Sequence, residues 1–183
     1  DALNEPDRPI PSGRVPGKTA FWFAVVWTAI AQTWAILLGP WIAAATGLGL
    51  VLAWAYSAPP LRLKMNGWWG NSAVAISYEG LAWITGAAIV IGGDLPAQPI
   101  LLIALLYSIG AHGIMTLNDF KSVEGDLTMG IRSLPAQLGP TRAARVACLF
   151  MLLPQIIVIL LLVRWGLTPF ALVVSLVVIA QCL

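Results

Sequence analysis

Six long apolar stretches follow one another along the chain, and shorter polar segments rich in proline, glycine and charged residues separate them. Each stretch approaches the roughly 20 apolar residues that a helix needs to cross a bilayer. We therefore predict an all-α, polytopic transmembrane helical bundle that forms a single domain over residues 1–183. Its predicted spans are 21–39, 41–56, 73–93, 100–117, 146–163 and 167–183.

The composition supports a membrane protein. Hydrophobic residues make up 59% of the 183 residues and charged residues only 10%, against about 25% charged residues in a typical soluble domain. The net charge is +2 and the basic residues form no run, which speaks against nucleic acid as a partner. The expected surroundings of the chain are membrane lipid.

Basic residues lie almost entirely in alternate connections between the predicted spans. The connections 1–18, 57–71 and 118–145 hold nine of the ten lysines and arginines, and Arg164 lies in the opposite set. Because loops on the cytoplasmic side of a membrane are enriched in lysine and arginine, we expect these three connections to be cytoplasmic. Most acidic residues lie in the same connections, so a charged site is expected on that side.

Two charged segments, 1–18 and 118–133, are expected to face each other at the mouth of the bundle. Asp119 and Asp126 are seven residues apart, so in a helix they project from one face two turns apart. Such a pair suits Mg²⁺, which is typically held by one or two carboxylates together with substrate phosphates. We predict that Asp119, Asp126 and Asp1 bind the metal.

The same segments supply basic side chains for a phosphate group. Arginine binds phosphate through its two-pronged guanidinium and lysine binds it as a point charge. The candidates are Arg8, Arg14, Lys18, Lys121 and Arg132. The alternative is that both segments are charged only because they are solvated loops of a membrane protein.

Two ionisable residues lie within predicted spans. A carboxyl group such as that of Glu79 is costly in a membrane unless it faces a cavity or a partner. Glu79 is therefore a functional candidate, with a buried structural hydrogen bond as the alternative. His112 lies six residues before Asn118, near the expected membrane boundary, and is a candidate ligand contact or a packed histidine.

Five strings of residues make the pattern specific. They are DALNEPDRPIPSGR at 1–14, YSAPPLRLKMNGWWGN at 56–71, ISYEGL at 76–81, and GAHGIMTLNDFKSVEGD with GIRSLP within 110–135. In this order they resemble the chlorophyll and bacteriochlorophyll synthase branch of the UbiA-type intramembrane prenyltransferases, and the bacterial members most closely. The resemblance extends from Asp1 to at least Leu138.

The resemblance implies nine transmembrane helices, with Mg²⁺ and a prenyl diphosphate bound between two aspartate-rich cytoplasmic loops. Asp1 matches only the last aspartate of the first motif, NDxxDxxxD, so the chain is expected to be a fragment that lacks N- and C-terminal parts. Many relatives have an acidic residue four positions before Asp126, where this chain has Ser122. This departure leaves open which oxygen atoms bind the metal.

The implied reaction is esterification of the propionate of a (bacterio)chlorophyllide with a geranylgeranyl or phytyl diphosphate, in the last step of (bacterio)chlorophyll synthesis. Asp119, Asp126 and Lys121 would be catalytic, and Glu79 and His112 would contact the acceptor. The diphosphate would be bound by Arg8, Arg14, Lys18 and Arg132. The implied location is the bacterial inner or photosynthetic membrane, with photosynthetic-assembly proteins as possible partners.

Other functions remain open from the sequence. A related prenyltransferase would act on an aromatic quinone precursor or on haem, but the strings around 9–14 and 76–81 speak against it. A transporter or a non-enzymatic membrane scaffold is a further alternative. Transporters often contain inverted repeats with paired broken helices, and the sequence shows no such repeats.

Overall fold

The computed structural model describes residues 5–182, and helices dominate this part of the chain. A π-helical turn, η2 (Ile76–Leu81), joins α3 to α4, and two short 3-10 turns are η1 (Leu63–Met65) and η3 (Asp119–Ser122). No strand is present within residues 5–182. The predicted all-α membrane bundle is confirmed. The helices are α1 (Gly17–Leu38), α2 (Pro40–Ser57), α3 (Gly67–Ala75), α4 (Ala82–Val90), α5 (Gln98–Asn118), α6 (Val123–Thr128), α7 (Leu134–Leu138), α8 (Pro140–Arg164) and α9 (Thr168–Cys182).

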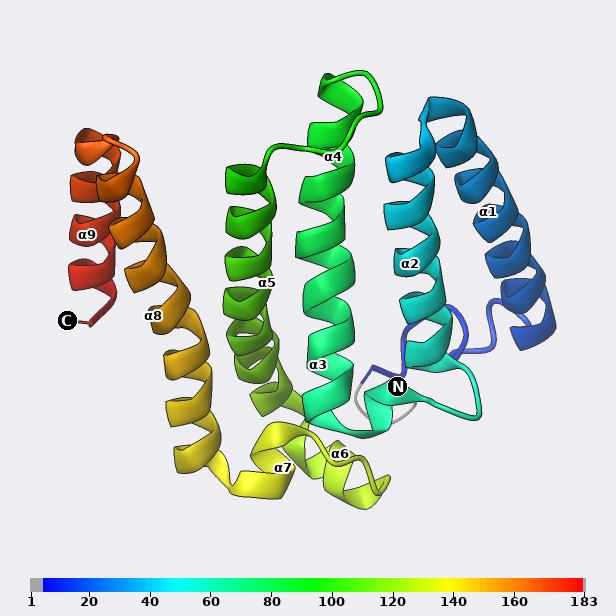
Figure 1. The fold of residues 1–183 in the computed structure, drawn as a ribbon. Coiled ribbons are helices and arrows are strands. Elements are labelled where there is room, and N and C mark those ends of the chain that lie inside the picture. The colour runs from blue at the N-terminus through cyan, green and yellow to red at the C-terminus, as the bar shows by residue number, and fades with distance from the viewer. Residues whose placement is uncertain (1–4, 183) are drawn as a thin grey trace.

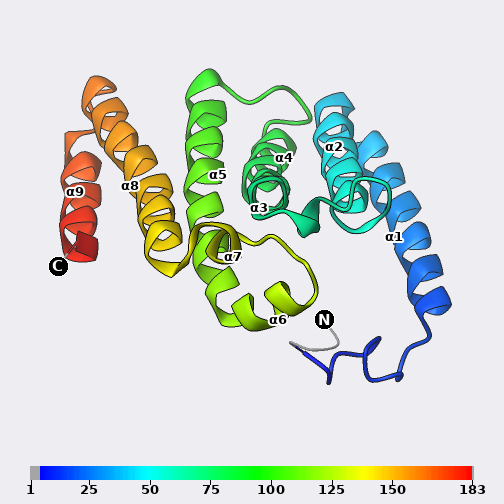
Figure 2. The same cartoon turned by 90° about the horizontal axis from the view of Figure 1, so that it is seen from below.

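The long helices stand side by side in one curved row, in the order α1, α2, α3 with α4, α5, α8 and α9 (Figure 1). The view from below in Figure 2 shows the long helices in the same order. The short helices α6 and α7 lie across the lower end of the row in Figure 1, where the N-terminal segment also lies. Three connections therefore gather at one end of the molecule.

Within residues 5–182, five helical segments are long and apolar enough to cross a membrane, as expected for a multi-pass membrane protein. The helix α9 is apolar but shorter, with 15 residues, although the sequence predicts a full span there. The five segments are Gly17–Leu38, Pro40–Ser57, Gly67–Val90, Gln98–Thr128 and Pro140–Arg164.

Two helices, α3 and α8, begin six residues earlier than the predicted spans that start at 73 and 146. The third span starts at Gly67, because the Asn66 side chain accepts a hydrogen bond from the Trp68 backbone N–H at 3.0 Å and caps the helix. The Trp68–Trp69 pair, expected in a loop, therefore belongs to the first turn of α3. The helix α8 starts at Pro140, a residue type favoured in the first turn because it lacks an N–H that the turn would leave unpaired.

Small residues make the contacts between neighbouring helices. Gly113 of α5 lies so close to α8 that an added Cβ would be 2.5 Å from the backbone oxygen of Ala147. Lipid is as apolar as the side chains, so helices in a membrane associate through such close packing. Large side chains such as Trp27 and Trp34 instead remain exposed on α1. The packing places polar groups of α3 and α5 face to face near the lower end.

Candidate functional site

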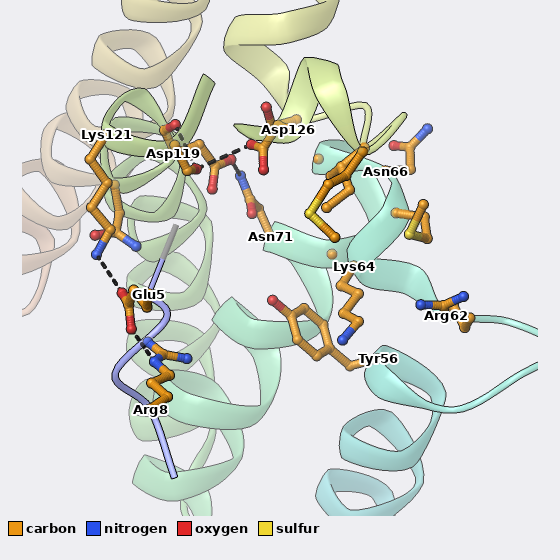
Figure 3. Close-up of a pocket in the computed structure, with 18 residues that line it drawn as sticks. Glu5, Arg8, Tyr56, Arg62, Lys64, Asn66, Asn71, Asp119, Lys121 and Asp126 are labelled. Atoms are coloured by element: carbon orange, nitrogen blue, oxygen red, sulfur yellow. Dashed lines mark hydrogen bonds and ion pairs between the residues drawn. The ribbon is translucent and has the colours of Figure 1, made fainter. Parts of the chain in front are cut away.

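A polar cavity of about 460 Å³ opens at the lower end of the row, and Figure 3 shows the side chains around it. Its lining comes from the N-terminal segment, the end of α2, the start of α3, and the segment after α5. The labelled lining residues are Glu5, Arg8, Tyr56, Arg62, Lys64, Asn66, Asn71, Asp119, Lys121 and Asp126.

Asp119, immediately after α5, is held by α3. The side-chain nitrogen Nδ2 of Asn71 donates a hydrogen bond to Oδ2 of Asp119 at 3.0 Å. The second N–H of the same amide reaches Thr116 Oγ1 at 3.3 Å. Asn71 and Thr116 are buried, so these bonds form away from solvent. The orientation of the Asp119 carboxylate is thereby set by a neighbouring helix.

Asp126 lies in α6 and faces the same cavity. It is only 6% exposed, and its Oδ2 lies 3.1 Å from Ser122 Oγ. Ser122 Oγ also lies 3.1 Å from the backbone oxygen of Asp119, and its single proton serves one of these acceptors at a time. The 3-10 turn η3 and the helix α6 make the segment from Asp119 helical. The seven-residue spacing therefore places the carboxylates of Asp119 and Asp126 at the same cavity.

The N-terminal segment meets this acidic pair from the other side. Glu5 forms an ion pair with Arg8, and its Oε1 lies 3.9 Å from Lys121 Nζ. Figure 3 shows Glu5 between the two basic side chains. These side chains are partly exposed, so each pair contributes at most about 1 kcal/mol. The structure thus brings Arg8 and Lys121, both predicted phosphate-binding residues, to one cavity.

The other predicted basic residues lie elsewhere. Arg14 donates hydrogen bonds to Ser12 Oγ at 3.0 Å and to the backbone oxygen of Asp7, within the N-terminal loop. Lys18 is exposed in the first turn of α1, and Arg132 lines a separate hollow after α6. None of these three lines the polar cavity within residues 5–182. Asp1, the predicted metal ligand, lies outside the described residues.

Sequence reasoning missed Tyr56, Lys64 and Asn71 as residues of this site. Tyr56 lies in α2 and Asn71 in α3. Lys64 lies in the loop between these helices, which pairs with the segment after α6 in an isolated parallel bridge between Asn66 and Arg132. All three residues lie in the string quoted for 56–71, so that string carried the only signal.

Two backbone hydrogen bonds hold this bridge. Arg132 N–H donates to Met65 O at 2.9 Å, and Gly67 N–H donates to Arg132 O at 2.7 Å. Gly67 has no room for a side chain, because a Cβ there would lie 2.5 Å from the backbone nitrogen of Leu134. The role of Arg132 shown by the structure is thus carried by its backbone.

Glu79 and His112 do not line the polar cavity. Glu79 lies in the π turn η2, and His112 is 3% exposed in α5. The His112 ring stacks on Phe150 with 4.5 Å between ring centroids, and the Trp68 ring lies 5.9 Å away. Neither ring nitrogen of His112 has a hydrogen-bond partner within the described chain.

The profile of the UbiA prenyltransferase family matches residues 1–183. This chain belongs to that family. The bacteriochlorophyll synthase 33 kDa chain of Cereibacter sphaeroides is 52% identical over 181 residues, covering 99% of this chain and 60% of that protein. The bacteriochlorophyll synthase 34 kDa chain of Chloroflexus aurantiacus is 51% identical over 181 residues, covering 99% and 57%.

A plant protein is also similar. The chloroplastic chlorophyll synthase of Arabidopsis thaliana is 42% identical over 164 residues, covering 81% of this chain and 39% of that protein. No solved structure matches the chain. The resemblance predicted from the five strings is therefore confirmed, and the chain spans 60% or less of the length of these curated relatives.

UbiA prenyltransferases generally depend on a divalent metal, and the residues present fit such an ion. The described residues contain no cluster of three or more acidic, histidine or cysteine side chains. Two carboxylates, Asp119 and Asp126, nevertheless face one polar cavity. A magnesium ion needs only one or two protein carboxylates when phosphate oxygens and water complete its shell. The donor set suits a metal bound together with a phosphorylated substrate.

Proposed function

We propose that the protein esterifies the propionate of a (bacterio)chlorophyllide with a C20 prenyl group, taken from geranylgeranyl or phytyl diphosphate. The observation that supports this most is the pair of carboxylates, Asp119 and Asp126, in a cavity that basic side chains share. The names of the similar proteins, bacteriochlorophyll and chlorophyll synthases, support the choice of acceptor.

Asp119 and Asp126 would hold Mg²⁺, with Asp1 as a further ligand. When bound, the metal supplies positive charge that neutralises the diphosphate. Asn71 and Ser122 each contact one carboxylate in the structure, at 3.0 and 3.1 Å, and so keep its oxygens oriented toward the cavity. Residues that orient metal ligands in this way are typically worth 10–100-fold in affinity or activity.

Basic residues would bind the diphosphate and stabilise the charge that develops as it leaves. Arg8, Lys64 and Lys121 line the cavity, and Arg62 lines it beside Lys64. Fixed charges aimed at a developing negative charge are usually the largest electrostatic contribution to catalysis. We keep Arg14, Lys18 and Arg132 as further candidates for this role.

The reaction requires no strong base. The bond between C1 of the prenyl group and the diphosphate oxygen breaks, and its electron pair leaves with the diphosphate. An oxygen of the acceptor carboxylate, already ionised at neutral pH, forms the new bond to C1. The apolar helices around the cavity would exclude water that competes for the prenyl cation. Contacts of Glu79 and His112 with the acceptor stay a prediction.

The site would lie on the cytoplasmic side of a bacterial inner or photosynthetic membrane. The connections rich in lysine and arginine gather at the end of the row that holds the polar cavity (Figure 1). Positive residues favour the cytoplasmic side, which supports this orientation. Binding of photosynthetic-assembly proteins stays a prediction.

The proposal is tested with the full-length protein in membranes, supplied with geranylgeranyl diphosphate and bacteriochlorophyllide. We expect an esterified pigment that EDTA abolishes and added Mg²⁺ restores. Asp119→Asn and Asp126→Asn should each lower the rate about 100-fold or more, since each removes charge from the centre of the site. Glu124→Gln is the matched control, because Glu124 is an exposed carboxylate of α6 that does not line the polar cavity.

Two results would contradict the proposal. The first is a folded protein that forms no ester with either bacteriochlorophyllide or chlorophyllide, which would turn attention to aromatic acids as acceptors. The second is full activity in both aspartate variants, which would make the segment after α5 a solvated connection only.

A further inference from the structure

We propose that a groove between α2 and the α3–η2 segment takes the part of the prenyl chain nearest to the diphosphate, and that Ala53 limits which chains fit. This inference rests on the proposed function, which places the diphosphate in the polar cavity. It assigns a role to the string ISYEGL, which the proposed reaction leaves unexplained.

The groove has a volume of about 360 Å³, and α2 and the α3–η2 segment contribute equally to its lining. Leu52 and Val74 give it an apolar wall. Ala53, Ala73 and Ser77 have small side chains, and their size leaves the groove open. A larger side chain at one of these positions would fill it.

Tyr56 lies between the groove and the polar cavity and contributes to both. It lies in the last turn of α2 and lines both hollows. Figure 3 shows the Tyr56 ring beside Lys64 at the edge of the polar cavity. A chain attached to a diphosphate in that cavity would therefore pass Tyr56 and enter the groove directly.

A second apolar cavity is larger but lacks such a shared residue. It has a volume of about 640 Å³ and lies between α5, α8 and α9. None of its described lining residues also lines the polar cavity, whereas the groove shares Tyr56 with it. We therefore assign the diphosphate-linked chain to the groove.

The string ISYEGL forms the π turn η2, Ile76–Leu81. Turns of this kind are rare in proteins, but those that occur often lie at functional sites. Gly80 packs against Ser108 of α5 without room for a side chain, while Ser77 and Tyr78 line the groove toward α2. The turn thus lets one short segment pack closely on α5 and shape the groove at the same time.

The groove acts through its shape. Lipid chains are as apolar as the groove lining, so a prenyl chain gains little hydrophobic free energy by leaving lipid for it. The lining from Ala73 to Tyr78 rises only about 7 Å at 1.5 Å per residue, so the groove holds part of a C20 chain. A blocked groove should therefore oppose binding of the chain and leave binding of the diphosphate intact.

The first test uses Ala53→Phe in the full-length protein in membranes, with Ala44→Phe as the matched control. Both residues are exposed alanines of α2, and only Ala53 lines the groove. We expect Ala53→Phe to raise the KM for geranylgeranyl diphosphate about tenfold or more, a typical effect of misfit in an apolar pocket. The inhibition constant of inorganic diphosphate should not change.

Equal changes in both constants, an unchanged KM, or the same effect from Ala44→Phe would overturn the groove assignment. The proposed function would still stand in each case, because the parent protein would still form the ester.

The second test needs no turnover, so it is informative even if the proposed reaction is wrong. A C20 diphosphate analogue with a photoreactive diazirine on its second isoprene unit is crosslinked, and the labelled peptides are identified by mass spectrometry. We expect labels within 51–57 and 73–78 that excess geranylgeranyl diphosphate removes. Labels in α8 and α9, or groove labelling by a photoreactive phospholipid that the diphosphate does not displace, would overturn the proposal.

Discussion

Asn71 on α3 donates a hydrogen bond to Asp119 at the end of α5, with 3.0 Å between Nδ2 and Oδ2. The same amide reaches Thr116 Oγ1 at 3.3 Å, so one side chain on α3 is bonded to two residues of the neighbouring segment. The direction in which the Asp119 carboxylate points thus depends on the contact between two membrane helices.

Asn71→Leu removes the amide and keeps a similar volume. We expect a loss of roughly 10- to 100-fold in kcat/KM, because the ligand loses its orienting partner. Thr116→Val is the control, since it removes the second hydrogen bond, and the bond from Thr116 Oγ1 to the His112 backbone oxygen, but leaves the Asn71–Asp119 contact. Steady-state kinetics of both variants decide the matter, and equal losses would mean that Asn71 acts only through helix packing.

Ser122→Asp would place a third carboxylate next to Asp119 and Asp126. Affinity for a hard cation rises with the number of charged ligands, so we expect half-maximal activity at a lower Mg²⁺ concentration. Ser122→Ala should raise that concentration, because Asp126 loses the hydroxyl 3.1 Å away. Thr128→Asp, on the exposed side of α6, should leave the Mg²⁺ concentration for half-maximal activity unchanged. A shift of the same size in this variant would point to a general effect of negative charge.

Lys121→Ala should raise the KM for the prenyl diphosphate about tenfold. It removes a charge-assisted hydrogen bond worth about 1.4 kcal/mol, and this free energy corresponds to a tenfold change in affinity. Stability should change by less than about 1 kcal/mol, since the ion pair with Glu5 is partly exposed. Glu5→Gln breaks the same pair and should not raise the KM. If both variants raised the KM equally, the ion pair between Glu5 and Lys121, and not the charge of Lys121 alone, would determine binding of the prenyl diphosphate.

Gly67→Ala should lower thermal stability and activity together. An added Cβ would lie 2.5 Å from the Leu134 backbone nitrogen and 3.0 Å from the Ser133 carbonyl carbon, and overpacking of this kind costs about 1–3 kcal/mol. Gly86→Ala in α4 meets nothing within 4 Å and serves as the control. Thermal unfolding in detergent measures the difference, and equal melting temperatures would show that the loop yields freely.

Local signals in the sequence predict the helices well. A long apolar stretch is helical wherever it crosses a bilayer, because only a helix or a closed barrel pairs all its backbone groups in lipid. The position of Asp119 and Asp126 at one cavity is also predictable from a local signal, because their seven-residue spacing follows the period of a helix. The start of α3 was missed although its cap, Asn66, stands directly before Gly67.

The remaining site residues could not be predicted because they arrive through long-range pairing. Lys64 lines the cavity from the connection that the Asn66–Arg132 bridge joins to the segment after α6, and Tyr56 lines it from the end of α2. Phosphate binding by the Arg132 side chain stays a prediction, whereas the bonds of its backbone N–H and C=O in the bridge could not be predicted from its charge. Charge can be read from a sequence, but the backbone partner of a loop cannot.

The Asn66–Arg132 bridge also divides the chain into an inner and an outer part. Residues 66–132 begin and end at the bridge, and its hydrogen bonds of 2.9 and 2.7 Å help to offset the entropy of closing this long segment. Asn71, Asp119 and Asp126 all lie inside it. The helices α1 and α9 lie at the two edges of the row and contribute none of the hydrogen bonds that orient Asp119 and Asp126. Substitutions in these two helices should therefore leave the orientation of both carboxylates unchanged.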